Sequence, residues 1–333
     1  MSRGDRSQPM PVKYWSSAGL ILTYRCTAAC ASCYLGCSPG RGEAMSVETA
    51  LEYWRQLIAA SPHGCRIHLT GGEPFTDWPA LIDLCRRARQ EGLGPLEKVE
   101  TNAFWADDES LVAARVRDLD EAGMGKLAIS ADPYHQQFVP IERCRLAARV
   151  AETVLGPARV QVRWRDWLDE GFDTDAMSDA ARGELFARYA AGGRDRFNGR
   201  AAREIGDYLP LRHFSEFADK VCGDVLLRGR GVHVDGRGCI MPGTCAGIEL
   251  GVITRQSSVG DIWNALAKDL PQRAVLWTLC RSGPAGLAQH AMEMGFQPRH
   301  GYAGKCHLCW DVRRFLAARG AGDLGPRWMY EVI

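Results

Sequence analysis

Short apolar runs alternate with longer amphipathic segments along the first half of the chain. Strand-like runs lie at residues 19–24, 66–70, 98–101, 126–130 and 158–164. Segments with helical spacing of apolar residues follow the first four runs, at about residues 46–60, 77–92, 107–123 and 140–155. This alternation predicts an α/β fold with right-handed βαβ units around a parallel sheet or partial barrel. In such folds the chemistry collects in the loops at the C-terminal ends of the strands.

The second half of the chain is patterned differently. Residues 192–245 are rich in Gly and Arg and show no clear helical period. Asp235-Gly236 predicts the turn of a β-hairpin within this stretch. Helical spacing returns in three later segments, residues 258–270, 285–295 and 310–319. An irregular region needs some other constraint, and metal ligation is one. We therefore expect a core of about residues 14–205 and a cysteine-bearing C-terminal region of about residues 206–333.

The composition narrows the class of protein. The 333 residues are 46% hydrophobic and 24% charged, which is ordinary for a globular protein with a substantial core. Lys and Arg total 41 against 40 Asp and Glu, which argues against a basic nucleic-acid-binding protein. No apolar run approaches the roughly 20 residues that cross a bilayer, and the N-terminus lacks the apolar segment of a signal peptide. We expect a cytoplasmic protein that binds neither nucleic acid nor membrane.

The chain contains 13 cysteines, which is the one unusual feature of its composition. In a reducing compartment, clustered cysteines more often bind metal or do redox chemistry than form disulfides. Cys26, Cys30 and Cys33 form a Cys-x3-Cys-x2-Cys pattern in the loop after the first predicted strand. Isolated cysteines are usually small buried hydrophobic residues, and four fit that description: Cys65, Cys85, Cys144 and Cys280.

Three thiolates form an incomplete ligand set for a structural zinc site or a fully ligated cubane, both of which take four. The pattern therefore predicts a [4Fe–4S] cluster with one iron left open for a substrate or cofactor. Cys37 is the alternative fourth ligand, and it would close the site. The second strand runs into Thr70-Gly71-Gly72-Glu73-Pro74, where the two glycines allow a ligand close to the backbone and the carboxylate can bind an ammonium group.

CTAACASC at residues 26–33, followed by LTGGEPF at residues 69–75, closely resembles the radical S-adenosylmethionine (radical SAM) superfamily. The resemblance covers about residues 18–165 and implies a partial (β/α)6 barrel. It implies that the three cysteines hold a [4Fe–4S] cluster whose open iron is chelated by SAM, with Gly71, Gly72 and Glu73 receiving the methionine ammonium. Reductive cleavage would give a 5′-deoxyadenosyl radical that removes a hydrogen atom from a substrate. An electron donor such as flavodoxin or ferredoxin is implied as a partner.

The resemblance also implies contacts with SAM at other strand ends. Asn102 would contact the ribose or another polar group, and Ser130 would face the ribose or the carboxylate. Arg163 would pair with that carboxylate, because a guanidinium offers two parallel donors. Ser32 occupies the position where the family often has an aromatic residue near the adenine. Tyr34, directly after Cys33, is the aromatic residue expected to contact the cofactor instead.

A second group of cysteines lies in the C-terminal region. It reads Cys222-x16-Cys239-x5-Cys245 and, after 60 further residues, Cys306-x2-Cys309. This arrangement resembles the SPASM and twitch auxiliary-cluster domains of radical SAM proteins, and there are too few cysteines for two clusters. One auxiliary [4Fe–4S] cluster is therefore expected, with Cys222, Cys239, Cys306 and Cys309 as the implied ligands. Cys245 is then spare, or it replaces Cys222. Zinc would accept the same residues.

Two substrate classes remain open. Many enzymes with this auxiliary layout modify a ribosomally made peptide by cross-linking, epimerisation or oxidation. Modification of such a peptide is therefore the main hypothesis. A separate peptide-recognition protein is then a further expected partner. The alternative is a small-molecule dehydrogenase or epimerase, for which Cys245 is the candidate hydrogen-atom donor. Asp132 and His135 are expected to look into the substrate cavity as candidate catalytic residues. A non-catalytic zinc scaffold is the third reading.

Overall fold

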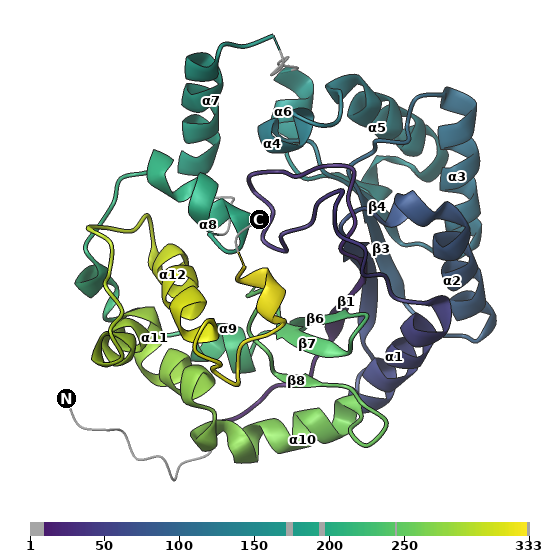
Figure 1. The fold of residues 1–333 in the computed structure, drawn as a ribbon. Helices are drawn as coiled ribbons and strands as arrows, with labels where there is room; N and C mark the ends of the chain where they lie inside the picture. The colour runs from purple at the N-terminus through teal and green to yellow at the C-terminus, as the bar shows by residue number, and fades with distance from the viewer. Residues whose placement is uncertain (1–9, 171–175, 193–196, 244, 332–333) are drawn as a thin grey trace.

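The computed structural model describes residues 10–170, 176–192, 197–243 and 245–331. Its centre is one eight-stranded sheet in the order β5-β4-β3-β2-β1-β6-β7-β8 (Figure 1). The strands are β1 (Ser17–Thr23), β2 (Arg66–Gly71), β3 (Leu96–Thr101), β4 (Lys126–Ile129), β5 (Val160–Val162), β6 (Gly231–Asp235), β7 (Cys239–Pro242) and β8 (Gly251–Val252). Strands β1 to β6 are parallel, whereas β7 and β8 continue the sheet antiparallel.

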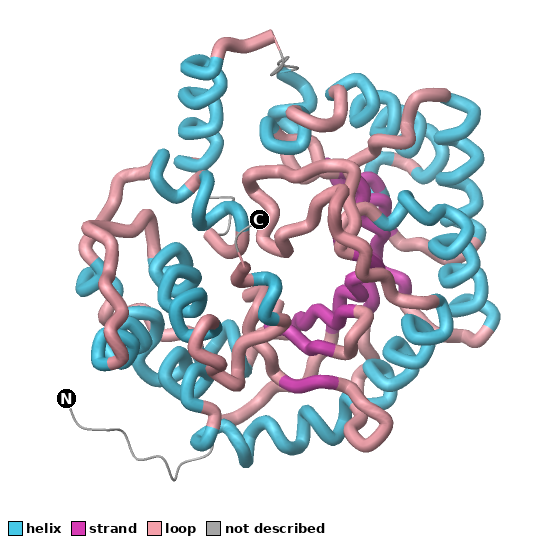
Figure 2. Tube along the Cα trace, in the orientation of Figure 1, coloured by secondary structure: helices cyan, strands magenta, loops and turns pink. Residues whose placement is uncertain are grey.

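Helices cover the outer face of the sheet (Figures 1 and 2). The layer consists of α1 (Val47–Ala60), α2 (Trp78–Gln90), α3 (Glu109–Glu121), α5 (Ile141–Leu155) and α10 (Val259–Asp269). Each of these helices except α5 begins at a polar cap residue. Ser46, the N-cap expected from the sequence, accepts a hydrogen bond from the Thr49 amide at 3.1 Å, and Asp108 accepts one from the Leu111 amide at 2.8 Å. The expected βαβ series is therefore confirmed.

The remaining helices lie around the open side of the sheet. They are α4 (Pro133–Gln136), α6 (Arg165–Glu170), α7 (Asp179–Ala191), α8 (Arg200–Glu204), α9 (Gly223–Leu227), α11 (Ala274–Glu293) and α12 (Lys305–Ala317). Short 3-10 turns are η1 (Pro74–Asp77), η2 (Pro157–Arg159), η3 (Gly206–Tyr208), η4 (Phe214–Phe217), η5 (Leu270–Gln272) and η6 (Arg327–Met329). Among the described helices, none is both long and apolar enough to cross a bilayer.

The centre of the sheet explains why β1 contains a glycine. The rings of His68 on β2 and His233 on β6 cover Gly19, and a Cβ there would lie 2.5 Å from Nε2 of His68 and 2.7 Å from Nε2 of His233. The two histidines are 3.3 Å apart between their Nε2 atoms. Strand β6 pairs with β1 from Ser17↔Gly231 to Ile21↔Asp235. The sixth parallel strand therefore comes from the C-terminal region and lies beside β1, not beside β5.

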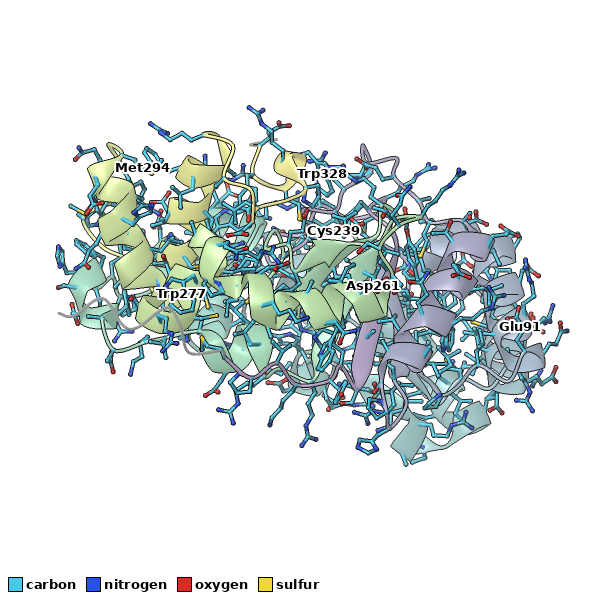
Figure 3. The ribbon with its side chains drawn as sticks, turned by 90° about the horizontal axis from the view of Figure 1, so that it is seen from below. Glu91, Cys239, Asp261, Trp277, Met294 and Trp328 are labelled. Atoms are coloured by element: carbon cyan, nitrogen blue, oxygen red, sulfur yellow. The ribbon has the colours of Figure 1, made fainter. Side chains whose placement is uncertain are left out.

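The stretch expected to be irregular contains more regular structure than its composition indicates. The predicted hairpin is present as β6–β7, and its turn is held by Asp235, whose carboxylate accepts from the amides of Arg237 at 2.9 Å and Cys239 at 3.0 Å. Figure 3 shows Cys239 between the helices that end near Glu91 and near Met294. The sheet therefore crosses the expected boundary between residues 205 and 206 without a break.

Candidate active site

Three cysteines of the loop after β1 line one cavity. Cys26 and Cys30 are buried and Cys33 is half-buried. The cavity has an empty volume of about 670 Å³ and lies at the C-terminal ends of the parallel strands. Of the residues proposed for SAM, those that line it are Tyr34, Gly71, Gly72, Asn102, Ser130 and Arg163. Residues from five separate parts of the chain thus meet at one edge of the sheet, as parallel strands require.

A residue far along the chain holds the cysteine loop. Nε of Arg200 donates to the carbonyl of Cys30 at 2.9 Å, and its backbone amide donates to the carbonyl of Cys33 at 3.1 Å. The same guanidinium also donates to the carbonyl of Cys37. A Cβ on Gly199 would lie 2.8 Å from the Cys33 carbonyl oxygen, so this segment packs directly on the loop. No local sequence motif points to Arg200, because its partners are backbone carbonyls.

Gly71 and Gly72 are required by packing as well as by the cavity. A Cβ on Gly72 would lie 2.5 Å from the carbonyl carbon of Arg25 and 3.1 Å from the amide nitrogen of Cys26. The Gly72 amide donates to the carbonyl of Thr23 at 2.7 Å, and the Glu73 amide donates to that of Arg25 at 3.0 Å. The end of β2 therefore packs directly against the backbone that carries the first cysteine. This packing is a second reason for glycine at position 72, and the sequence alone does not show it.

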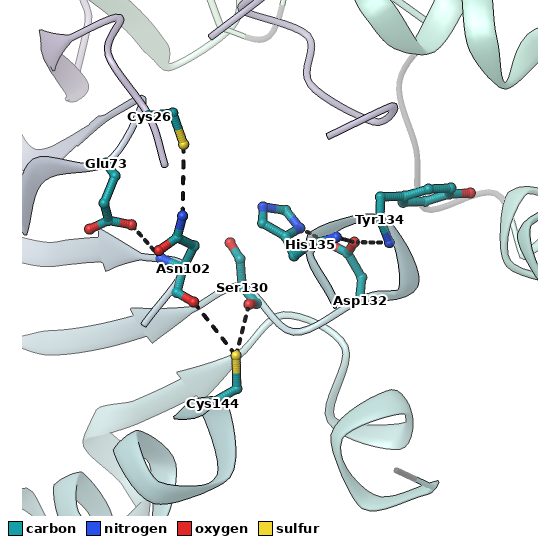
Figure 4. Close-up of polar contacts among 8 residues, drawn as sticks. All are labelled: Cys26, Glu73, Asn102, Ser130, Asp132, Tyr134, His135 and Cys144. Atoms are coloured by element: carbon teal, nitrogen blue, oxygen red, sulfur yellow. Dashed lines mark hydrogen bonds and ion pairs between the residues drawn. The ribbon is translucent and has the colours of Figure 1, made fainter. Parts of the chain in front are cut away.

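Glu73 is not among the residues that line this cavity, and Figure 4 shows its carboxylate directed at Asn102. Its side chain is fully buried, and its carboxylate accepts from the amides of Phe75 at 3.1 Å and Asn102 at 2.6 Å and from Oγ1 of Thr101 at 2.9 Å. Burial raises the pKa of Glu73 to about 7, although these donors oppose the shift. In this structure the Glu73 carboxylate orders the end of β3, and its contact with the methionine ammonium stays a prediction.

Asn102 is directed at the cysteines. Its Nδ2 donates to Sγ of Cys26 at 3.7 Å and to Oγ1 of Thr27 at 3.0 Å (Figure 4). The thiol of Cys144, which the sequence suggests is only a buried hydrophobic residue, donates to the carbonyls of Asn102 and Ser130 at 3.6 Å each. Cys144 therefore links the ends of β3 and β4 under the cavity.

Asp132 and His135 act as a pair. Asp132 is 1% exposed and caps α4, and its second oxygen lies 2.7 Å from Nδ1 of His135. Burial would lower the pKa of His135, but the Asp132 carboxylate and the Cys30 thiol raise it well above its ordinary value. Only His135 lines the cavity. In this structure the Asp132 carboxylate caps α4 and orients the His135 ring beside Cys30, and a contact of Asp132 with substrate stays a prediction.

Ser130, Arg163 and Tyr34 also line a second cavity on the inner face of the sheet, with an empty volume of about 1120 Å³. Strand side chains supply its polar wall: His68, Lys98, Glu100, Gln161 and His233. Glu100 accepts from Oγ1 of Thr70 at 2.6 Å and pairs with Nζ of Lys98 at 2.6 Å. Although burial opposes it, Lys98 holds the pKa of Glu100 at about 2, so this group is a carboxylate.

A fourth thiol, that of Cys37, is buried in the wall of the first cavity. A hydrogen bond from Cys37 lowers the pKa of Cys33 to about 5, and the pKa of Cys37 itself is raised well above its ordinary value by that bond and by burial. The pair therefore consists of a thiolate at Cys33 and a thiol at Cys37.

The three thiols and the polar groups around them can be compared with what a [4Fe–4S] cluster and SAM require. Among the described residues, no three His, Cys, Asp or Glu side chains converge closely enough to bind a single metal ion. A cubane is larger than one ion, and its thiolates surround a space. Cys26, Cys30 and Cys33 face one cavity, and the polar groups that line it beyond them can receive the amino and carboxylate groups of SAM. The residues present fit both groups.

The C-terminal cysteines form a second group of thiols. Burial raises the pKa of Cys222 to about 12, and neighbouring Cys309 and Cys306 add to the shift. Cys245 has its pKa raised to about 12 by burial, with Cys309, Cys306 and Cys222 again adding to it and Arg313 opposing it. Cys222 and Cys245 therefore lie near each other and near Cys306 and Cys309. Cys280 also acts on Cys222, and the buried Arg313 acts on Cys245.

Cys239 lies apart from this group. Its pKa is raised by burial and by the Asp235 and Glu249 carboxylates, with no contribution from the other C-terminal thiols. Its thiol lies 3.8 Å from Oε2 of Glu249, and it packs in a different apolar cluster from Cys222 and Cys245. The pKa shifts thus group Cys245, rather than Cys239, with Cys222, Cys306 and Cys309, and this grouping supports the ligand set proposed below.

Arg313 is fully buried between the two cysteine groups. It donates to the carbonyl of Ala246 at 2.8 Å, to the Tyr330 hydroxyl at 2.8 Å and to Oδ1 of Asn198 at 2.6 Å. Asn198 is two residues before Arg200, which holds the first cysteine loop. A single segment thus contacts the surroundings of both groups.

A parallel partial barrel with three thiols around a cavity at its C-terminal edge defines an α/β protein whose site suits an iron–sulfur cluster with an open position. Residues 20–150 match the model of the radical SAM superfamily, and this part of the chain is a radical SAM domain. Its cofactors are a [4Fe–4S] cluster and SAM.

The chain is similar to several solved structures, and one of them, with a TM-score of 0.50, shares the fold. Streptococcus suis SuiB bound to the precursor peptide SuiA is 13% identical with a TM-score of 0.50, over 84% of this chain and 74% of that one. BtrN in complex with AdoMet and 2-DOIA is 16% identical with a TM-score of 0.49, over 83% and 90%. Native anSMEcpe with bound AdoMet and a Cp18Cys peptide is 12% identical with a TM-score of 0.44, over 90% and 95%. No curated protein sequence matches the chain.

Proposed function

We propose that the protein is an enzyme that cleaves SAM reductively and uses the resulting radical to remove a hydrogen atom from a carbon of its substrate. The observation that carries this proposal is the single cavity shared by the thiols of Cys26, Cys30 and Cys33 with Ser130 and Arg163. When bound, the cluster and SAM supply the electron transfer and the radical. The chain binds and orients them and limits the access of water.

The chain's own groups divide these tasks. We assign the backbone of Gly71 and Gly72 to the methionine ammonium, and Ser130 and Arg163 to the ribose and the carboxylate, for which a guanidinium is suited. The ring of His135, held by Asp132, lies beside Cys30, where it is placed to donate a hydrogen bond to a sulfur. Hydrogen bonds to cluster sulfurs are one means by which proteins tune reduction potentials.

The cavity on the inner face supports a compact polar substrate. Its wall carries a cation at Lys98, a carboxylate at Glu100, the amide of Gln161 and the ring nitrogens of His68. Buried polar groups need partners, so a ligand with several hydroxyl, amino or carboxylate groups satisfies this wall better than an apolar one. We therefore place dehydrogenation or epimerisation of such a small molecule first, reversing the order expected from the sequence.

A ribosomally made peptide is the second candidate. SuiB from Streptococcus suis, which has this fold, was solved bound to its precursor peptide, and the same cavity has room for a polar peptide side chain. In this case a separate recognition protein would present the peptide to the mouth of the cavity.

We also propose that Cys222, Cys245, Cys306 and Cys309 ligate one auxiliary [4Fe–4S] cluster. Four protein thiols leave no open iron, so this group serves electron transfer or the ordering of the C-terminal region. The alternative of a zinc scaffold is decided by metal analysis of anaerobically purified protein. Two cubanes give about eight irons per chain and brown colour, whereas colourless protein with stoichiometric zinc excludes the enzyme.

The substrate class is tested with an extract of cells grown in deuterated medium, separated by size into metabolites and peptides. Reconstituted enzyme, SAM and dithionite are incubated with each fraction, and 5′-deoxyadenosine is analysed by mass spectrometry. Deuterium transferred from the metabolite fraction supports the small-molecule proposal, and transfer from the peptide fraction supports the second candidate. Formation of 5′-deoxyadenosine without label from either fraction would contradict hydrogen abstraction from both classes.

A further inference from the structure

A third large pocket lies among α1, α2, the end of β1 and the loop that follows β1. It has an empty volume of about 1090 Å³. Helices α1 and α2 are neighbours in the outer layer (Figure 1). The residues assigned above to the clusters, to SAM and to the substrate are not among those that line it. We call it the outer pocket, and it is separate from the candidate active site.

The floor of the outer pocket is apolar. Four residues that border its empty volume are buried: Met45, Ala50, Leu81 and Leu84. At its mouth the exposed residues include Gly42 and Ala44, which are too small to cover this floor. Sites for small molecules are typically concave and lined mainly by apolar groups, with a few polar groups that fix the orientation of the ligand.

Two arginines supply the positive charge of the wall. Arg25 is exposed and Arg41 is half-buried, and both line the outer pocket. Their backbones converge at the carbonyl of Ser38, which accepts from the amides of Cys26 at 3.1 Å and Arg41 at 3.2 Å. Among the described residues, neither guanidinium forms an ion pair with a carboxylate. The guanidinium of Arg41 lies over the Trp328 ring at 4.2 Å, a contact that leaves its charge in place.

One carboxylate also lines the outer pocket, that of Asp77. This side chain caps α2 and accepts from the amide of Ala80 at 3.1 Å. The wall therefore carries two cations against one anion, which favours a ligand with a negative group. A carboxylate suits a guanidinium especially well, because it accepts two parallel N–H groups.

We propose that the outer pocket binds an amphipathic monocarboxylate, a small molecule with an unbranched apolar chain and one carboxylate. The chain lies on the apolar floor, and the carboxylate pairs with Arg25 and Arg41. Pro74 lines the outer pocket as well as the three-cysteine cavity, so the ligand lies against the outer wall of that cavity. The proposal goes beyond the proposed function and does not depend on it, since its test measures binding alone.

The test measures the affinity of the reconstituted holoenzyme for three probes by calorimetry, below the concentrations at which they form micelles. Decanoate and octanoate differ by two methylenes, and decyltrimethylammonium replaces the carboxylate by a cation. Arg25→Gln/Arg41→Gln removes the cations of the wall, with the exposed pair Arg117→Gln/Arg255→Gln as its control. Thermal unfolding shows whether each variant is folded.

A second variant fills the outer pocket without changing its charge. Ala80→Phe places a ring over the floor from α2, where Ala80 is half-buried. Ala267→Phe is its control, because Ala267 is also half-buried on a helix of the outer layer but does not line the outer pocket. The two variants test the charged wall and the apolar floor independently, so a folding defect in one of them leaves the other decisive.

We expect the wild type to bind decanoate about 15-fold more tightly than octanoate, because each buried methylene contributes about fourfold. Both pocket variants should weaken decanoate binding by at least about tenfold, whereas both controls should match the wild type. No saturable binding of decanoate to the wild type would overturn the proposal. Equal affinity for decyltrimethylammonium would also overturn it, since the arginines would then select nothing. Decanoate binding that survives Ala80→Phe would place the ligand elsewhere on the protein and overturn it as well.

Discussion

Replacement of Gly72 by alanine tests whether the cysteine loop depends on contact with the end of β2. The new Cβ would lie 2.5 Å from the carbonyl carbon of Arg25, about 0.9 Å short of the 3.4 Å of an ordinary contact, and 3.1 Å from the amide of Cys26. The neighbour is backbone, so no side chain can rotate away. Relief requires the loop to move and puts at risk the hydrogen bonds from Gly72 to Thr23 and from Glu73 to Arg25.

The expected cost follows from these contacts. Overpacking in a tight interior costs about 1–3 kcal/mol, and two lost hydrogen bonds add about 1 kcal/mol each. The sum of roughly 3–5 kcal/mol corresponds to a fall in melting temperature of about 4–7 °C for 333 residues, at about 2.1 cal/mol/K per residue. Displacement of Cys26 should also remove the first cluster, and so about four irons per chain.

The assay measures iron and sulfide after reconstitution, together with thermal unfolding of the apoprotein. Gly42→Ala is the matched control. Gly42 lies in the cysteine loop after β1, and a Cβ there would have no atom within 4 Å. We expect the control to resemble the wild type, and Gly72→Ala to keep only the auxiliary cluster. A Gly72→Ala protein with full iron and an unchanged melting temperature would refute the argument that the two glycines are needed for packing.

Three further results are expected. Cys245→Ala should lose about four irons per chain while Cys239→Ala keeps them, and the reverse result in an iron assay would restore the ligand set expected from the sequence. Arg313→Met should lower the free energy of unfolding of the apoprotein by about 3–5 kcal/mol in denaturant titrations, because three buried acceptors lose their cation; a cost under 1 kcal/mol would contradict this role. Burial raises the pKa of Glu73 from 4.5 to about 7, so its contribution to apoprotein stability is full below pH 4.5 and is lost as the pH rises through 7. That loss of about 3 kcal/mol should be absent in Glu73→Gln, and identical pH profiles for the two proteins would refute it.

The strands and helices of the first half follow from local pattern. Apolar runs that alternate with amphipathic segments leave few alternatives to a parallel sheet covered by helices. The sequence predicts helix α11 only from residue 285, because Pro284 interrupts the helical spacing of apolar residues. The structure has two helices joined at Gly283, whose φ is 63°, so the first of them begins at Ala274.

The C-terminal cysteines show where sequence spacing stops being informative. Cys239 and Cys245 are six residues apart, and either is compatible with a ligating pair. The choice depends on which way each side chain points, and that is fixed by the hairpin register, in which Cys239 pairs with Val252. The thiol of Cys239 lies 3.8 Å from Oε2 of Glu249, whereas Cys245 lies beyond the end of β7 at Pro242, where strand alternation does not apply.

The same limit applies to Arg200 and Arg313. Both are arginines in segments without a motif, and their partners are backbone carbonyls, one amide side chain and one hydroxyl, which any sequence supplies. Their roles arise only when distant residues are brought together: Arg200 is 170 positions from Cys30, and Arg313 is 115 positions from Asn198. Composition and spacing locate the thiols of this protein; the cations that support them become visible only in the folded chain.

The continuity of the sheet also bears on how the two regions depend on each other. β1 carries the first cysteine loop, and one of its two edges is paired with β6, from the C-terminal region. Without residues 206–333, that edge would be unpaired, Gly19 would lose the His233 ring that covers it, and Asn198 would lose Arg313. An exposed central edge invites aggregation. The three-cysteine cavity is therefore not a property of the first 205 residues alone, because its supporting strand is completed by the region that holds the second group of thiols.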